Sequence, residues 1–151
     1  TEYSLQFKLP NILQINILVK KPKYSIFNKS LNKYLMIDAD GVGLLTLDQS
    51  SLPILVKDNL LEKEGQKISN NDLFALKLIE GINQMYQVNT GTIQNDTLVV
   101  DLPTGVRVIL PIEGGDIKVL LGSLRLIYTK LTTENSNYSQ IDLRFKNPVI
   151  K

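Results

Sequence analysis

Short segments in which apolar and polar residues alternate make up much of this chain. In residues 13–19 (LQINILV), every second residue is apolar, and a glutamine and an asparagine fall on the other face. Alternation with a period of two is typical of a strand that buries one face. We expect further strands where short apolar segments are bounded by turn-forming residues. These segments are residues 23–27, 34–37, 42–46, 54–56, 88–93, 97–101 and 106–110.

Proline, asparagine, aspartate and glycine mark the turns between these segments. We expect a turn at Pro10-Asn11, ahead of the first strand, and hairpin turns at residues 38–41 (DADG) and 102–105 (LPTG). The glycine that ends each hairpin turn supplies the positive φ angle that a tight turn requires. Lys21-Pro22 ends the first strand, because proline donates no hydrogen bond to a ladder and restricts the residue before it.

Two longer segments carry apolar residues at helical spacing. In the first, residues 75–86, these residues fall on one face, and residues 70–72 (NND) offer capping side chains. The second begins after Gly114-Gly115, with Asp116 as its expected N-cap. Its expected buried positions are Ile117, Leu120, Leu121, Leu124, Ile127, Tyr128 and Leu131.

The order of the elements predicts the fold class. Several strands are followed by a helix, three strands, a second helix and a final strand. This order is typical of an α+β fold with a mostly antiparallel β-sheet and two helices packed on it. Its 151 residues suffice for one good core or two very small ones. We expect a domain boundary at Lys20-Lys21-Pro22, where the proline separates the first strand from everything after it. The residues before this boundary are too few to fold alone, so we expect them to be the tail of a truncated upstream domain.

The end of the chain alternates once more. Residues 140–145 (QIDLRF) place isoleucine, leucine and phenylalanine on one face and the polar residues Gln140, Asp142 and Arg144 on the other. We expect a strand that lies on the core, with Asp142 and Arg144 on its outer face. One interpretation of these two side chains is a surface ion pair. The other is a sheet edge that a partner strand joins, with Phe145 and Ile150 as apolar anchors.

Composition narrows the classes of function. A net charge of +2 with scattered lysines gives no basic stripe for nucleic acid. The chain has no cysteine and no histidine, which excludes disulfides and thiolate metal sites and removes the commonest general base. We therefore expect no catalysis, no cofactor and no metal. Asp38 and Asp40 can share a cation, but the same residues serve a turn, which we favour. An enzyme would need Asp38, Asp40 or Asp142 in a buried cluster.

Three stretches together resemble the FtsQ/DivIB family of bacterial cell-division proteins. Residues 9–17 (LPNILQINI), followed by Lys21-Pro22, resemble the closing strand of its POTRA domain. Residues 34–42 (YLMIDADGV), and then 52–55 (LPIL), look like the start of its β domain. Residues 141–145 (IDLRF) with 148–150 (PVI) are similar to its terminal strand. The order and spacing of the three stretches agree with the family, and the resemblance spans nearly the whole chain.

The chain departs from the family pattern at three places. Lys20-Lys21 stands where the family usually has an acidic–basic pair, and Leu110-Pro111 stands where a glycine commonly closes the strand before the second helix. Phe145 stands where the family often has tyrosine, so any hydrogen bond from that hydroxyl is lost.

The resemblance implies a division of the chain and a role. Residues 1–21 would be the end of a truncated POTRA domain, and residues 22–151 the β domain. The protein would be a non-catalytic divisome scaffold for septation, anchored in the bacterial cell membrane by a single upstream span, with this domain on the extracytoplasmic side. We expect the chain, which starts at Thr1, to be an excised fragment without that anchor.

The implied partners are the small coiled-coil division proteins of the FtsB (DivIC) and FtsL types. A partner segment would add to the terminal strand of the β domain, which corresponds here to residues 140–145 and their continuation to Lys151. The partner-binding residues carried over by position are Asp142, Arg144, Phe145, Lys146, Asn147, Val149 and Ile150. The alternative is a POTRA-like or cell-wall-associated module that binds peptidoglycan or an unfolded polypeptide, with Tyr24 and Tyr34 lining a groove.

Overall fold

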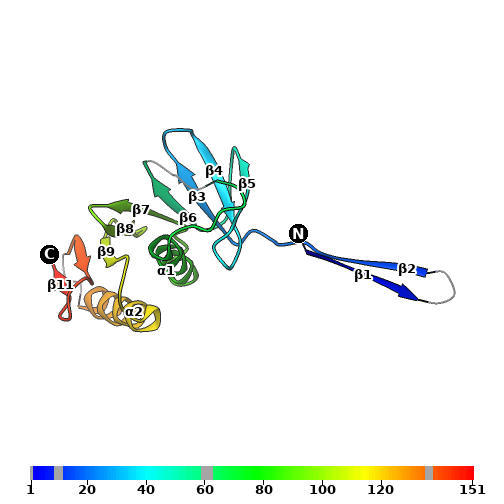
Figure 1. Ribbon diagram of the computed structural model, residues 1–151. Coiled ribbons are helices and arrows are strands. Elements are labelled where there is room, and N and C mark those ends of the chain that lie inside the picture. Colours follow the sequence, from blue (N-terminus) through cyan, green and yellow to red (C-terminus); the bar gives the residue numbers. More distant parts are fainter. Residues whose placement is uncertain (1, 9–11, 59–62, 135–137) are drawn as a thin grey trace.

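A curved β-sheet covered by two helices forms the body of the protein (Figure 1). The computed structural model describes residues 2–8, 12–58, 63–134 and 138–151. The described strands are β1 (Glu2–Lys8), β2 (Ile12–Leu18), β3 (Tyr24–Asn28), β4 (Lys33–Ile37), β5 (Gly43–Leu47), β6 (Ile54–Lys57), β7 (Thr90–Gln94), β8 (Thr97–Asp101), β9 (Arg107–Pro111), β10 (Gln140–Asp142) and β11 (Val149–Ile150). The helices are α1 (Asn70–Tyr86) and α2 (Ile117–Thr133).

The sheet is built from two antiparallel meanders and three crossovers, the first of which carries the chain from β5 to β6 and pairs β6 parallel with β3. Its strand order is β11-β10-β9-β8-β7-β6-β3-β4-β5. Within β3-β4-β5 and β7-β8-β9 neighbours are antiparallel, as short hairpin turns require. β6 and β7 are parallel because α1 carries the chain back across the sheet, and α2 likewise makes β10 parallel to β9. The expected α+β fold with a mostly antiparallel sheet is thus confirmed.

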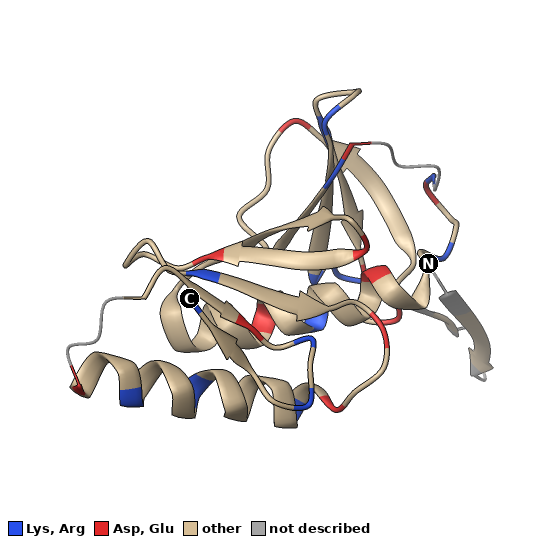
Figure 2. Cartoon of the chain, turned by 90° about the vertical axis from the view of Figure 1, so that its left-hand side faces the viewer, with Lys and Arg blue, Asp and Glu red and all other residues tan. Residues whose placement is uncertain are grey.

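Both helices pack on the same side of the sheet (Figure 1 and Figure 2). Ile26, Leu55 and Val108 on the strands meet Ile79 of α1 and Leu124 of α2 in one continuous core. Burial of each such side chain contributes about 1.5–3 kcal/mol. All seven apolar positions expected to face inward on α2 belong to this core or pack against it. The 3.6-residue period therefore located the inner face of the second helix correctly.

The helix ends follow local capping rules. Asp116 caps α2 as expected, and its Oδ1 accepts a hydrogen bond from the Lys118 amide at 2.7 Å. The N-cap of α1 is Ser69, and not one of residues 70–72, because the serine hydroxyl oxygen accepts from the Asp72 amide at 3.0 Å. α1 ends where Gln87 takes a left-handed φ of 59° and its amide donates to the Asn83 carbonyl.

Strands β1 and β2 form a separate antiparallel hairpin that projects from the body (Figure 1). β1 was not among the expected strands, and the expected turn at Pro10-Asn11 lies outside the described residues. Leu5, Phe7, Leu13 and Ile15 of this hairpin are exposed, and cross-strand pairing sets all four on one face. An isolated two-stranded hairpin is marginal at best. The assignment of residues 1–21 to the end of a further domain stays a prediction.

Neither helix in the described part of the chain is long and apolar enough to cross a bilayer.

The turn between β4 and β5 is organised by a buried carboxylate. Asp38 is 2% exposed, and its Oδ1 accepts from the amides of Asp40 at 2.9 Å and Val42 at 2.8 Å. Gly41 takes a φ of 86°, as the hairpin prediction requires. Lys20, which follows the N-terminal hairpin, places its Nζ 3.2 Å from Asp38 Oδ2. The turn interpretation of Asp38 is confirmed, and the same carboxylate ties the hairpin junction to the sheet.

Asp38 should make folding sensitive to acid. Burial alone would raise its pKa, but hydrogen bonds from Val42, Lys20 and Asp40 together hold the pKa below its usual value of 3.8. Because the folded pKa is the lower one, this stabilisation is complete above pH 3.8 and is lost as pH falls through the folded pKa. We expect Asp38→Asn to lower the free energy of unfolding at pH 7 by about 1–3 kcal/mol.

Urea unfolding of both chains at pH 7 and near pH 2.5 checks this. The difference in free energy of unfolding between the unaltered chain and the Asp38→Asn variant should be smaller at pH 2.5 than at pH 7. Asp40→Asn is the matched control, because the Asp40 side chain is 78% exposed and should leave the acid dependence unchanged. An equal difference in free energy of unfolding at both pH values would contradict the stabilising role of the Asp38 carboxylate.

Candidate protein-binding site

The final segment of the chain forms one margin of the sheet, but with a different division of strands from the one expected. The expected strand over residues 140–145 ends at Asp142, and the chain returns antiparallel to it as β11. β10 therefore lies between β9 and β11, with both of its edges occupied. Among the described residues, the open edge at this margin belongs to β11, that is to Val149 and Ile150, and β5 forms the opposite margin of the sheet.

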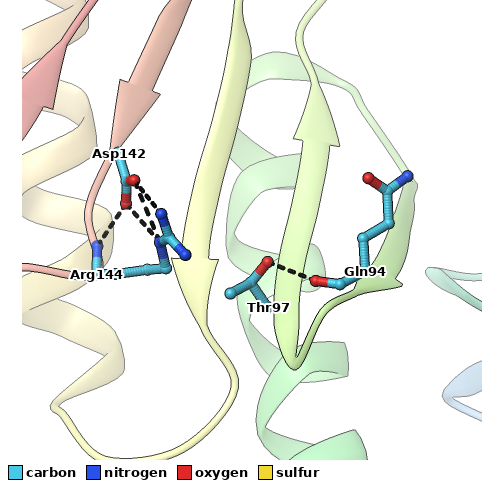
Figure 3. Close-up of polar contacts among 4 residues, drawn as sticks. All are labelled: Gln94, Thr97, Asp142 and Arg144. Carbon is cyan, nitrogen blue, oxygen red and sulfur yellow. Dashed lines mark hydrogen bonds and ion pairs between the residues drawn. The ribbon is translucent and has the colours of Figure 1, made fainter.

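An ion pair between a buried carboxylate and an exposed arginine ends β10 (Figure 3). Asp142 accepts hydrogen bonds from Arg144 Nε at 2.9 Å, from Nη2 at 2.6 Å and from the Arg144 amide at 3.1 Å. Arg144 is the main cause that holds the pKa of Asp142 below its usual value. The expectation of a solvent-facing Asp142 is wrong, since only 4% of the residue is exposed. Arg144 folds over the carboxylate, so these two residues shape the turn that leads into β11.

Phe145 does not continue the inner face of β10. Leu143 is buried in the core as the alternation predicts, but the chain has left the strand by Phe145, which is 57% exposed. The Arg144 guanidinium lies 5.4 Å from the centre of the Phe145 ring, within cation–π range. Lys146 and Asn147 are exposed in the same connection. The structure thus presents an aromatic side chain to solvent next to the open strand.

An apolar groove of about 420 Å³ runs between β11 and α2. It is lined by Ser123, Leu126, Ile127, Lys130, Leu131, Glu134, Pro148 and Ile150. Leu126 is 75% exposed, on the side of α2 away from the buried Leu124. The sequence analysis did not single out Leu126, although a leucine outside the inward stripe of a helix was a signal available there. The groove and the open edge together form the candidate site.

Packing against the rest of the core sets the position of α2. Gly81 of α1 faces Leu121 of α2 so closely that an ideal Cβ on Gly81 would lie 2.2 Å from Leu121 Cδ1. At the other end of α2, the Tyr128 ring makes edge-to-face contacts with Tyr86 and Tyr138, with centroids 5.0 and 6.5 Å apart. These contacts fix the outer wall of the groove against the sheet.

Basic side chains lie around the groove, and one of them is paired, since the Lys130 Nζ lies 4.0 Å from Oε1 of Glu134, which also lines the groove. α2 carries three cationic side chains and no carboxylate between its caps (Figure 2). These side chains are Lys118, Arg125 and Lys130. Lys146 and Lys151 are exposed beside β11, whereas the charge of Arg144 is met by Asp142. This distribution favours a partner with carboxylates at its margins.

Tyr24 and Tyr34, the other binding residues considered from the sequence, make contacts within the fold. Tyr24 is 1% exposed, and its hydroxyl donates to Glu80 Oε2 at 2.7 Å. Tyr34 stacks on Phe27 with ring centroids 4.7 Å apart. Tyr24 does line a groove of about 690 Å³ beside α1, but Tyr34 is not among the lining residues, so the two tyrosines do not line one groove together. Among the described residues, no group of three or more His, Cys, Asp and Glu side chains is arranged to hold a metal ion.

Comparison with protein-family models gives no match for this chain, and comparison with curated proteins gives none either.

Proposed function

We propose that this chain is an extracytoplasmic, non-catalytic scaffold domain of FtsQ/DivIB type that acts in bacterial cell division. It binds small coiled-coil division proteins of the FtsB (DivIC) and FtsL types by strand addition at its C-terminal sheet edge. The observation that supports this proposal is the open edge of β11 beside an exposed apolar groove. The resemblance of the sequence further implies attachment to the cell membrane through an upstream segment.

The energetics of strand addition explain why both parts of the site matter. Each backbone hydrogen bond contributes only about 0.5–1.5 kcal/mol net, whereas association costs about 4–15 kcal/mol in lost freedom of motion. Pairing with a short edge strand therefore needs apolar burial in addition. Leu126, Phe145 and Ile150 are 75%, 57% and 44% exposed. Covering them would supply that burial without any rearrangement of the core.

Phe145 gives the direct test of the proposal. We expect Phe145→Glu to raise the Kd for the soluble parts of the FtsB- and FtsL-like proteins from the same genome by about 30-fold or more, as loss of an aromatic anchor does. The circular dichroism spectrum should not change, because Phe145 lies outside the core. Isothermal titration calorimetry measures the affinity.

Phe7→Glu is the matched control, because Phe7 is also an exposed phenylalanine but lies on the N-terminal hairpin. It should bind both division proteins like the unaltered chain. Unchanged affinity of the Phe145 variant, or failure of the unaltered chain to bind either protein, would remove the proposed function.

A further inference from the structure

The ladder between β10 and β11 determines which backbone groups face the open edge. Lys151 and Gln140 exchange two hydrogen bonds, the amide of each donating to the carbonyl of the other at 3.0 Å. The register then pairs Ile150 with Ile141 and Val149 with Asp142. Hydrogen-bonded and non-hydrogen-bonded pairs alternate along an antiparallel ladder. Val149 therefore also faces β10, whereas Ile150 and Pro148 turn their backbone groups outward.

The outward edge carries few hydrogen-bonding groups. Ile150 presents an N–H and a C=O, but Pro148 presents only a C=O because proline has no N–H. Ile150 is thus the one outward donor within β11 and the proline before it. A proline on an edge strand limits indiscriminate strand pairing. A strand that joins this edge must align its backbone on Ile150.

The same register decides where the side chains of an added strand go. Residues opposite one another in a ladder project to the same face of the sheet. Ile150 shares its face with Ile141, which is buried in the core with Leu124 and Leu131 of α2. A residue added opposite Ile150 projects to this face in parallel and antiparallel pairing alike. Its side chain therefore enters the groove against α2.

Building on the proposed function, we propose that Ile150 sets the register of the bound strand and that α2 selects one side chain of this strand, at the position opposite Ile150. The Ile150 N–H and C=O hold the partner backbone, and the partner residue opposite Ile150 inserts an apolar side chain between Ile150 and Leu126. The bound segment is accordingly extended, with apolar residues at every second position. The exposed Lys146 and Lys151 beside β11 favour carboxylates at its margins.

Two pairs of variants test the two contacts separately. Ile150→Pro and Ile150→Ala both shorten the side chain, but only the proline removes the outward N–H. Neither variant disturbs the β10–β11 ladder, which uses the amides of Val149 and Lys151. Leu126→Glu places a charge in the groove, and Leu31→Glu is its control, since Leu31 is 68% exposed in the turn between β3 and β4. Thermal unfolding verifies that all four fold.

The probes are the two division proteins and, independently, phage-displayed random peptides about ten residues long, twice a typical strand. The peptides are selected on immobilised residues 1–151. We expect the selected peptides to alternate apolar and polar residues. Ile150→Pro should weaken their binding about 10-fold more than Ile150→Ala, and Leu126→Glu should weaken it about 10-fold or more, with no effect of Leu31→Glu.

The outcomes separate this inference from the proposed function. If amphipathic peptides bind with this dependence and the division proteins do not bind, the register is correct and the proposed function is wrong. If the division proteins bind and Phe145→Glu weakens them, while Ile150→Pro equals Ile150→Ala, the register is wrong and the proposed function stands. The proposed register would also be wrong if no peptide is selected. It would equally be wrong if the selected peptides bind Ile150→Pro as they bind Ile150→Ala and are not weakened by Leu126→Glu.

Discussion

Leu124→Ala is expected to lower the free energy of unfolding by about 2–5 kcal/mol, the usual effect of emptying a fully buried leucine site. Leu124 is 0% exposed and holds the middle of α2 on the sheet. Domains of this size are stable by about 5–15 kcal/mol, so the change removes a large share of the total. Urea unfolding followed by circular dichroism measures it.

The matched control lies two residues further along the same helix. Leu126 is 75% exposed, so Leu126→Ala should change the free energy of unfolding by no more than about 0.5 kcal/mol. It should nevertheless weaken partner binding, because Leu126 lines the groove. Equal stability losses in the two variants would contradict the packing of α2 described above.

Gly81→Ala is expected to weaken the packing of α2 against α1. The added Cβ would lie 2.2 Å from Leu121 Cδ1 and 3.2 Å from its Cγ, so more than the tip of the leucine must move. Overpacking of this kind lowers the free energy of unfolding by about 1–3 kcal/mol, and the gain in helix propensity offsets about 1 kcal/mol of this loss. Displacement of α2 should also weaken partner binding, because α2 forms the outer wall of the groove.

Gly122→Ala is the control for this prediction. Gly122 also lies within a helix, but a Cβ there meets no atom within 4 Å. This variant should gain up to about 1 kcal/mol from helix propensity alone. Thermal unfolding of the two variants side by side gives the comparison. A Gly81→Ala chain as stable as Gly122→Ala would mean that Leu121 swings aside and that the helix contact is not tight.

Much of the fold could be read from local periodicity. The segment Thr97–Asp101 is a strand with the bounds expected, and Asp116 caps α2 as expected. Local rules succeed in these places because the hydrogen bonds and the apolar face both lie within a few residues of one another. The missed N-cap at Ser69 is a displacement of one residue in the same local pattern.

The candidate site was only partly predictable. The sequence indicated the position of the site at the end of the chain and named Phe145 and Ile150 as apolar anchors beside a sheet edge. The alternation of residues 140–145, however, placed Phe145 on the inward face of a strand, whereas this residue follows the end of β10 and is 57% exposed. The alternation also placed Asp142 in solvent, which is wrong because Arg144 folds back over its carboxylate. Side-chain pairing of this kind depends on the turn after β10, which a period of two does not describe.

By itself, the sequence determined the α+β class, the inner faces of both helices and the apolar character of the closing segment, since each depends on residue spacing along one element. The three-dimensional arrangement alone shows that β10 is enclosed, that Ile150 carries the outward donor and that Leu126 of α2 lines the same groove as Ile150. These properties depend on which strands become neighbours after a helical crossover. That choice is made by contacts between residues far apart in the chain, so no local pattern contains it.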